Sequence, residues 1–124
     1  MLDVFTANAN GNDLKKITSG GKSSNHGWSN SSNYISYKYG PIDSGKGDIY
    51  IIKSDGTLNH NITSLNLDFV SISWSPNDDK LLFEFPTESI PEIYMATKDG
   101  AIIQQITNAG YSSRPQWIDV NLIE

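Results

Sequence analysis

The hydrophobic positions of this sequence recur at an interval close to 44 residues. Three apolar runs follow Asp3, Asp48 and Glu92, and these acidic residues lie 45 and 44 residues apart. Three further sets keep nearly the same spacing: Gly11, Gly56 and Gly100; Thr18, Thr63 and Thr107; and Trp28, Trp74 and Trp117. Because four sets of residues share one spacing, the sequence indicates an internal repeat. Its copies lie at approximately 3–47 and 48–91, with an incomplete copy at 92–124.

Each copy divides into four short apolar runs, the number of strands in one blade of a β-propeller. We name these runs A to D, from the inner to the outer strand. Runs B and C are nearly continuous in aromatic and branched residues, as expected of strands covered on both faces. Run D carries polar residues such as Lys15-Lys16 and Gln104-Gln105, which suits an outer edge. The expected strands are A at 24–28, 70–74 and 114–118; B at 34–39 and 81–85; C at 4–6, 49–52 and 93–95; and D at 14–18, 58–63 and 102–107.

Turn residues separate these runs. Asn10-Gly11, Asp55-Gly56 and Asp99-Gly100 stand between runs C and D and tolerate the positive φ angles of tight hairpins. The segments 29–33 and 75–79 have turn chemistry and stand between runs A and B. No segment shows a helical period with caps. The sequence therefore predicts one all-β domain over 1–124, a β-propeller of about three four-stranded antiparallel blades with almost no helix.

One stretch resembles a known repeat. Residues 74–83 (WSPNDDKLLF), followed by 92–95 (EIYM), 98–100 (KDG) and 105–107 (QIT), look like the WD-like repeat of TolB-type β-propellers. The first copy departs from this pattern at His26 and Asn30, where prolines are expected, and the last lacks the Ser-Pro pair after Trp117. The resemblance implies a propeller fold and a periplasmic or other extracytoplasmic location. It is weak for function, because similar blades occur in prolyl oligopeptidase-type peptidases and some carbohydrate-active enzymes.

The phase of the repeat suggests an assembly. The sequence begins on a C run and stops after an A run with a short possible B run at Leu122-Ile123. Propellers usually need four to eight blades. If the C–D pair of one chain joined the A–B pair of another, two chains would close a six-bladed ring as a homodimer with two equivalent junctions. The rival expectation is that this sequence belongs to a longer single-chain propeller.

Charge and composition narrow the partners. The chain has 124 residues, a formal net charge of −5 and a pI of about 4.8, with no basic cluster longer than Lys15-Lys16. Nucleic acid is therefore not an expected partner, because phosphate binding needs a basic face. No apolar run approaches the roughly 18 residues of a membrane span. The first residues lack the basic and apolar regions of a signal peptide, so an exported protein would need a leader outside this sequence, and a cytoplasmic location stays open.

Sequence motifs give little support for catalysis. The segments 40–47 and 21–23 resemble phosphate-binding loops. In the first, Gly47 replaces the residue that binds magnesium and a strand follows in place of a helix. In the second, Lys16 stands where the leading glycine is required. Neither His26 nor His60 lies near a Gly-x-Ser-x-Gly elbow. Two histidines without cysteine argue against a zinc site. We therefore expect no catalytic residue, no metal and no cofactor.

Other polar and aromatic residues have structural explanations. Asp55 and Asp99 are expected to be turn residues, and Asp78-Asp79 likewise. His60 is expected to be a solvated side chain on an outer strand, and His26 to pack between blades. The three tryptophans are expected to pack blade against blade.

Variable loops are the remaining candidates for a binding surface. The D-to-A and B-to-C connections lie on one face of a propeller and vary in sequence here, at 19–23, 40–47, 64–69, 86–91 and 108–112. Binding residues concentrate on such loops. The candidate binding residues are Lys22, His26, Asp43, Phe69, Glu88, Tyr111 and Arg114. We expect a non-catalytic module that holds a protein or peptide on this face or in the central channel; the alternative is the propeller portion of a peptidase or carbohydrate-active enzyme.

Overall fold

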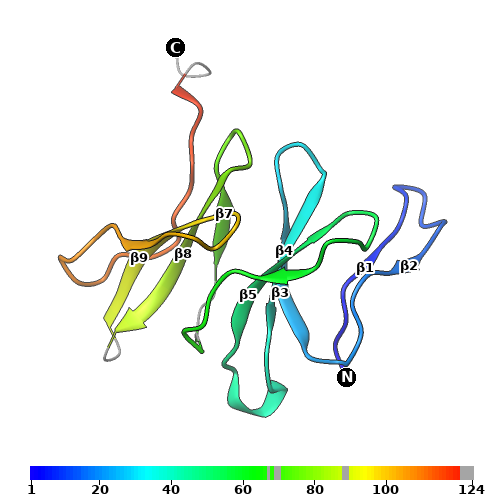
Figure 1. The fold of residues 1–124 in the computed structure, drawn as a ribbon, viewed down its shortest axis with the longest axis horizontal. Coiled ribbons are helices and arrows are strands. Elements are labelled where there is room, and N and C mark those ends of the chain that lie inside the picture. Colours follow the sequence, from blue (N-terminus) through cyan, green and yellow to red (C-terminus); the bar gives the residue numbers. More distant parts are fainter. Residues whose placement is uncertain (67, 69–70, 88–89, 121–124) are drawn as a thin grey trace.

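The computed structural model describes residues 1–66, 68, 71–87 and 90–120 (Figure 1). Within them the chain is mostly strand and turn, with a short 3-10 turn, η1 (Ile42–Ser44). The strands are β1 (Phe5–Thr6), β2 (Lys15–Lys16), β3 (Ser23–Trp28), β4 (Tyr34–Tyr39), β5 (Asp48–Lys53), β6 (His60–Asn61), β7 (Ile72–Trp74), β8 (Lys80–Thr87), β9 (Ile90–Thr97) and β10 (Ile103–Gln105). The expected all-β class is confirmed.

The strands form two complete blades and one strand pair. The hydrogen-bonded orders are β3-β4-β5-β6 and β7-β8-β9-β10, which we call the second and third blades, and every pair is antiparallel. Strands β1 and β2 pair with each other and form what we call the first pair. The three groups stand side by side in chain order (Figure 1). The expected A-to-D order is therefore confirmed in both complete blades.

Two expected features are wrong. Residues 114–118 do not form a strand, although burial alternates from residue 115 to residue 120 as in an extended chain. A strand is defined by a hydrogen-bonded neighbour, and none is present for this segment among the described residues. The expected loop at 86–91 is mostly strand, since Pro86 pairs with Pro91 and Thr87 with Ile90. Two prolines opposite one another remove donors from the same rung, so the hairpin loses only that rung.

The hydrophobic core lies between the blades. Ile49 and Ile51 of β5 pack with Trp74, Leu81 and other residues of the third blade. The opposite face of the second blade packs on the first pair through Val4, Ile17, Ile35, Tyr37 and Ile52. Strand β5 thus buries both of its faces, which explains its nearly continuous apolar sequence.

One hydrogen-bonded unit repeats three times at the start of run C. In the second blade, Thr63 Oγ1 accepts the backbone N–H of Ile49 at 2.9 Å and donates to Asp48 Oδ1 at 3.0 Å. Asp48 also accepts the backbone N–H groups of Leu65 and Asn66, so it fixes the loop that leads to the next blade. The equivalent units are Asp3 with Thr18 and Gly21, and Glu92 with Thr107 and Gly110. The acidic and threonine markers of the sequence repeat are therefore bonded to each other.

Removing the hydroxyl of Thr63 should destabilise the second blade. Thr63 is 3% exposed, and Thr63→Val would leave the Ile49 N–H and the Asp48 carboxylate each without one partner. We expect a loss of about 1–3 kcal/mol in the free energy of unfolding, measured with urea. Thr63→Ser keeps the hydroxyl and should cost clearly less. Equal losses in the two variants would show that the hydroxyl contributes nothing.

Trp74 and Asp78 connect the second and third blades directly. The Trp74 indole N–H donates to Ser36 Oγ at 3.0 Å, and its ring stacks on Tyr34 at a centroid distance of 6.1 Å. Asp78, which is 5% exposed, accepts the backbone N–H groups of Asn30 and Ser31 at 2.7 and 2.9 Å. Trp74 therefore packs between blades as expected, whereas Asp78 does more than form a turn.

The other two tryptophans have different surroundings. Trp28, one repeat earlier than Trp74, is 50% exposed, because the first pair presents no B strand to it within the described residues. Trp117 is partly buried, and its backbone N–H donates to Ser73 Oγ at 3.1 Å. Its indole N–H is buried without a hydrogen-bond partner in the described structure. In the second blade, Ser36 of strand B accepts the indole N–H of Trp74. The equivalent residue of the third blade is Leu82, whose side chain has no acceptor for the indole N–H of Trp117.

Candidate functional site

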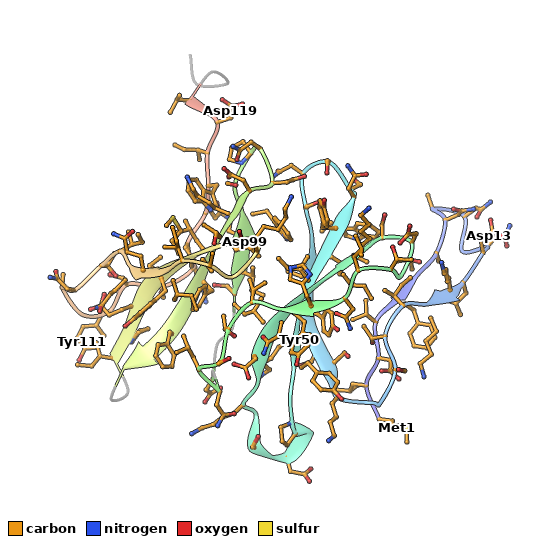
Figure 2. The ribbon with its side chains drawn as sticks, viewed as in Figure 1. Met1, Asp13, Tyr50, Asp99, Tyr111 and Asp119 are labelled. Carbon is orange, nitrogen blue, oxygen red and sulfur yellow. The ribbon has the colours of Figure 1, made fainter. Side chains whose placement is uncertain are left out.

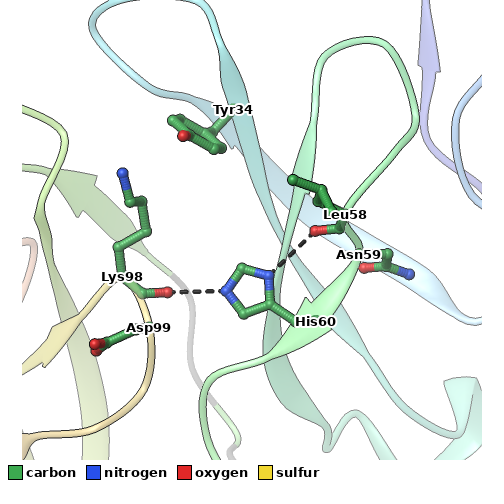
Figure 3. Close-up of a pocket in the computed structure, with 6 residues that line it drawn as sticks. All are labelled: Tyr34, Leu58, Asn59, His60, Lys98 and Asp99. Atoms are coloured by element: carbon green, nitrogen blue, oxygen red, sulfur yellow. Dashed lines mark hydrogen bonds between the residues drawn. The ribbon is translucent and has the colours of Figure 1, made fainter.

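A mostly apolar hollow opens at the junction between the second and third blades (Figure 3). Its volume is about 370 Å³, and its walls come from the start of β4, the turn that leads into β6, and the turn after β9. The lining residues are Tyr34, Leu58, Asn59, His60, Lys98 and Asp99. All three segments lie at the end of the blades where strands A and B, and strands C and D, are joined. We call this the turn end, and the hollow the apolar hollow.

Tyr34 is held in place by the third blade. Its ring stacks on Trp74, with an angle of 22° between the planes, and the Lys98 ammonium lies 4.4 Å from the ring centroid. A cation over an aromatic ring is attracted by the negative face of the ring. Stacking on Trp74 and attraction to the Lys98 ammonium therefore hold the ring in place, and it forms a rigid wall of the hollow.

Leu58 forms an exposed lip of the hollow in a strained conformation. Its side chain is 68% exposed, and its φ angle is +51°, a region that bulky L-residues rarely adopt. The turn before it is closed by the Lys53 N–H, which donates to the Thr57 carbonyl at 2.9 Å. An apolar side chain held in a costly backbone conformation at the mouth of a hollow is a candidate contact residue.

His60 joins the two walls. Its Nδ1 lies 3.1 Å from the carbonyl oxygen of Leu58, and its Nε2 lies 3.0 Å from that of Lys98 in the third blade (Figure 3). The expectation that His60 is a solvated side chain is therefore wrong. The sequence could not show this contact, since it depends on where the turn of the next blade lies.

Asp99 supplies a negative charge at the rim. Hydrogen bonds from the Thr97 hydroxyl and the Ala101 N–H, with a smaller contribution from nearby His60, hold the pKa of Asp99 below its usual value. The carboxylate therefore stays ionised well below neutral pH. Asp99 forms the turn that the sequence predicts, and it also borders the hollow.

A second, more polar hollow shares Tyr34 with the first. Its volume is about 340 Å³, and Asn33, Lys53, Ser54 and Asp55 complete its lining. Hydrogen bonds from the Thr57 hydroxyl and N–H hold the pKa of Asp55 below its usual value. The turn end of the second blade thus offers an apolar hollow and a polar hollow on either side of one fixed aromatic residue.

The binding residues expected from the sequence lie elsewhere. Lys22 and Asp43 are exposed at the opposite end of the blades, which we call the loop end, and the Gly40 N–H donates to the Lys22 carbonyl at 3.1 Å. A smaller hollow of about 120 Å³ lies beside them, lined in part by Gly40 and Lys46. The structure therefore brings the segments that carry Lys22 and Asp43 together at the loop end.

The remaining expected residues are more scattered. Tyr111 is 82% exposed, and Figure 2 shows it at the far edge of the third blade from Asp99. Arg114 is exposed, and its backbone N–H donates to Glu84 at 3.1 Å. Tyr111 and Arg114 both have positive φ angles, of 67° and 53°. Phe69, Glu88 and the side chain of His26 lie outside the described residues, so the proposed contact surface at the loop end stays a prediction.

Sequence reasoning missed the lining of the apolar hollow. The turn end has short, regular turns, which were explained by backbone geometry alone. Two signals were available in the sequence: a leucine directly after the Asp55-Gly56 turn and a histidine in an edge strand. Neither indicates that the two residues meet Tyr34 and the next blade.

The described residues contain no group of three or more histidine, cysteine, aspartate or glutamate side chains placed to hold a metal ion. None of the helical segments in the same residues has the length and apolar character needed to cross a bilayer.

Comparison with solved structures identifies the fold. The chain superposes on TolB from Acinetobacter baumannii with a TM-score of 0.69 and 22% identity, covering 86% of this chain and 26% of that one. It is similarly close to a putative TolB from Agrobacterium tumefaciens, with a TM-score of 0.67, 17% identity, and coverage of 83% and 40%. A chain of a nidogen/laminin complex gives a TM-score of 0.64, 18% identity, and coverage of 83% and 39%.

An isopeptidase, AtxE2 in its apo form, is a more distant match, with a TM-score of 0.59, 16% identity, and coverage of 79% and 20%. No family model and no curated protein matches the sequence. The likeness shows that the blades are those of a β-propeller, which is the fold that the sequence motif indicates. The chain spans between a fifth and two fifths of the length of these solved chains.

Proposed function

We propose that this chain acts as a non-catalytic β-propeller binding module that holds a peptide segment of a protein partner at the turn end. The observation that carries the proposal is the apolar hollow, with its fixed Tyr34 wall and its exposed Leu58 lip. Ligand sites are typically concave and mostly apolar, with a few placed polar groups. One of the similar solved structures is a complex between two proteins, nidogen and laminin.

The chemistry of the two hollows defines the peptide. An aliphatic or aromatic side chain fits the apolar hollow, where it would contact Leu58 and the edge of Tyr34. Asn59 and the ionised Asp99 at the rim can bind the peptide's N–H groups. A polar side chain next to the anchor fits the second hollow, beside Lys53 and Asp55. The preferred ligand is thus an extended segment with one apolar anchor and a polar neighbour.

Catalysis is not part of the proposal. His60 is the residue at the hollow that could act as a base, but both of its ring nitrogens lie at hydrogen-bonding distance from backbone carbonyls. A general base needs a free ring nitrogen directed at its substrate. We propose an extracytoplasmic location for the module, on the basis of the TolB-type motif alone.

Leu58→Asn is expected to separate binding from folding. Asparagine tolerates the left-handed region, so relief of strain should raise the free energy of unfolding by about 1 kcal/mol. Loss of the apolar lip should weaken peptide binding about tenfold. The probe is a peptide selected on the whole chain from a displayed random library, and affinity is measured by fluorescence polarisation.

Leu14→Asn is the matched control for this experiment. Leu14 is 70% exposed and lies outside both hollows, and its φ angle is not positive. This variant should leave affinity unchanged and should not gain stability. If Leu58→Asn and Leu14→Asn bind the selected peptide equally well, or if no peptide is selected, the proposed function is wrong.

The homodimer remains a second proposal. The half-exposed Trp28 is at the position where Trp74 meets a B strand, so a B strand from a second copy could cover it. We expect sedimentation equilibrium to give twice the mass of 13.7 kDa, and the Trp28→Ala variant to sediment as a monomer. A wild-type chain that stays monomeric at high micromolar concentration would exclude this assembly.

A further inference from the structure

His60 makes two contacts that a neutral imidazole cannot both satisfy. Its Nδ1 faces the Leu58 carbonyl at 3.1 Å and its Nε2 faces the Lys98 carbonyl at 3.0 Å. A carbonyl oxygen only accepts hydrogen bonds, and a neutral histidine carries a single N–H. The imidazolium, which carries two N–H groups, is the form that donates to both oxygens.

The preceding repeat has a lysine at the position equivalent to His60. Lys15 lies 45 residues before His60, at the same position of strand D, and its ammonium donates to the carbonyl of Asp55 in the next C–D turn. Both side chains therefore run from strand D of one blade to the turn of the following blade. The chain thus has a lysine at the first junction and a histidine at the second.

Charged groups of both blades lie at the turn end together with His60. From the third blade, Asp99 interacts electrostatically with His60, and the Lys98 ammonium is directed onto Tyr34. From its own blade, Asn59 accepts the hydroxyl of Tyr37 at 2.8 Å, and Lys53 and Asp55 line the neighbouring polar hollow.

We propose that His60 is a proton-dependent connector between the second and third blades. When protonated, it donates one hydrogen bond to each wall of the apolar hollow. When it loses a proton, the tautomer with hydrogen on Nε2 keeps the bond to Lys98, and the lone pair of Nδ1 then faces the Leu58 carbonyl. The connection between the blades survives, while the strained lip at Leu58 loses its support.

Protonation of His60 would then regulate peptide binding at the apolar hollow, an inference that rests on the proposed function. With Leu58 fixed by the imidazolium, the hollow is preformed, and a preformed site binds without the cost of ordering its lip. Peptide affinity should then rise as the pH falls from 8.0 to 5.5, the interval in which histidines take up a proton.

Urea unfolding of the whole chain at pH 5.5 and 8.0 tests the connector without any ligand. Three proteins are compared: the wild type, His60→Lys, which copies the lysine of the preceding repeat, and His60→Gln, which keeps one donor without a charge that titrates. His26 is present in all three, so its contribution cancels. Between pH 8.0 and pH 5.5, the equilibrium constant for unfolding of the wild type should fall about fivefold more than that of either variant. This difference is the effect of one net hydrogen bond.

Nitrogen-15 spectra of the His60 ring provide a second measurement, because they show which ring nitrogens carry a proton at each pH. We expect protons on both ring nitrogens at pH 5.5 and on Nε2 alone at pH 8.0. Parallel unfolding profiles for the three proteins, or a proton on Nδ1 alone at pH 8.0, would overturn the inference.

Affinity for the library-selected peptide distinguishes the two proposals. The wild type should bind severalfold more tightly at pH 5.5 than at 8.0, and His60→Lys should show no such change. If unfolding shows the pH difference and no peptide binds at either pH, the connector stands and the proposed function fails. If the peptide binds with the same affinity at both pH values, the step from connector to regulation is wrong.

Discussion

Trp74→Ala should lower the free energy of unfolding by about 4 kcal/mol. The indole is 7% exposed, packs in the core between the second and third blades, and donates to Ser36 Oγ. Its removal leaves a cavity in the core between the two blades, where the indole packs with Ile49, Ile51 and Leu81. Chemical denaturation followed by far-ultraviolet circular dichroism measures the loss.

Trp28→Ala provides the matched comparison. Trp28 occupies the same position one repeat earlier, and half of its surface is exposed. In the monomeric chain, the same chemical change should therefore cost less than about 2 kcal/mol. A loss for Trp28→Ala as large as that for Trp74→Ala would mean that Trp28 is buried in solution, and it would favour the homodimer.

Asp78→Asn is expected to have the second largest effect, about 2–3 kcal/mol. The Asp78 carboxylate accepts two backbone N–H groups from the turn of the neighbouring blade, at Asn30 and Ser31, and it is almost fully buried. The asparagine side chain tolerates the φ angle of +58°, so the backbone need not change. The amide, however, replaces one of the two acceptor oxygens by an NH2 group, which cannot accept the backbone N–H that faces it.

The contribution of Asp78 should depend on pH. Burial raises the pKa of Asp78, but the hydrogen bonds from Ser31 and Asn30 outweigh it and hold the pKa below its usual value. A carboxyl whose pKa is lower in the folded than in the unfolded chain stabilises the fold above the unfolded value of about 3.9. This stabilisation is lost as the pH falls through the folded-state pKa.

Asp79→Asn is the control, because Asp79 is exposed and its carboxylate, among the contacts described, accepts only the Ser75 hydroxyl within its own turn. It should cost less than about 1 kcal/mol, and the wild type and Asp79→Asn should lose stability in parallel below pH 4. Asp78→Asn should lose less over the same interval. Identical acid profiles for all three proteins would contradict the role given to Asp78.

The sequence was sufficient for those features that depend on local pattern. The period of the tryptophans, threonines and acidic residues gave the blades, and the apolar content of residues 49–52 showed that β5 is covered on both faces. The Asp-Gly dipeptides gave the C–D turns, which the structure contains. These features follow from the φ preferences of turn residues and from the pattern of apolar and polar residues. Both can be read from the sequence of one strand or turn.

Contacts between blades could not be predicted in this way. Asp78 was explained as a turn residue and His60 as solvated, because nothing in their own segments shows which backbone groups of the next blade they meet. The hairpin at Pro86 and Pro91 was missed for a different reason. Each proline alone argues against a strand, and only their pairing opposite one another makes the ladder possible.

The two ends of the blades also had to be compared in three dimensions. Variation in loop sequence favoured the loop end, where Lys22 and Asp43 lie. The two larger hollows described here lie at the turn end, because short turns from adjacent blades leave space between them. The length and variability of a loop do not report such a space.

Mapping of the peptide-binding surface by NMR shows directly whether the peptide binds at the turn end or at the loop end. The library-selected peptide is titrated into nitrogen-15-labelled chain, and the shifts of backbone amides are followed. We predict that the largest changes occur at the turn end, at Tyr34, Leu58, Asn59, His60 and Lys98. Changes centred instead on Lys22, Asp43 and Tyr111 would contradict it and would return the binding site to the loop end.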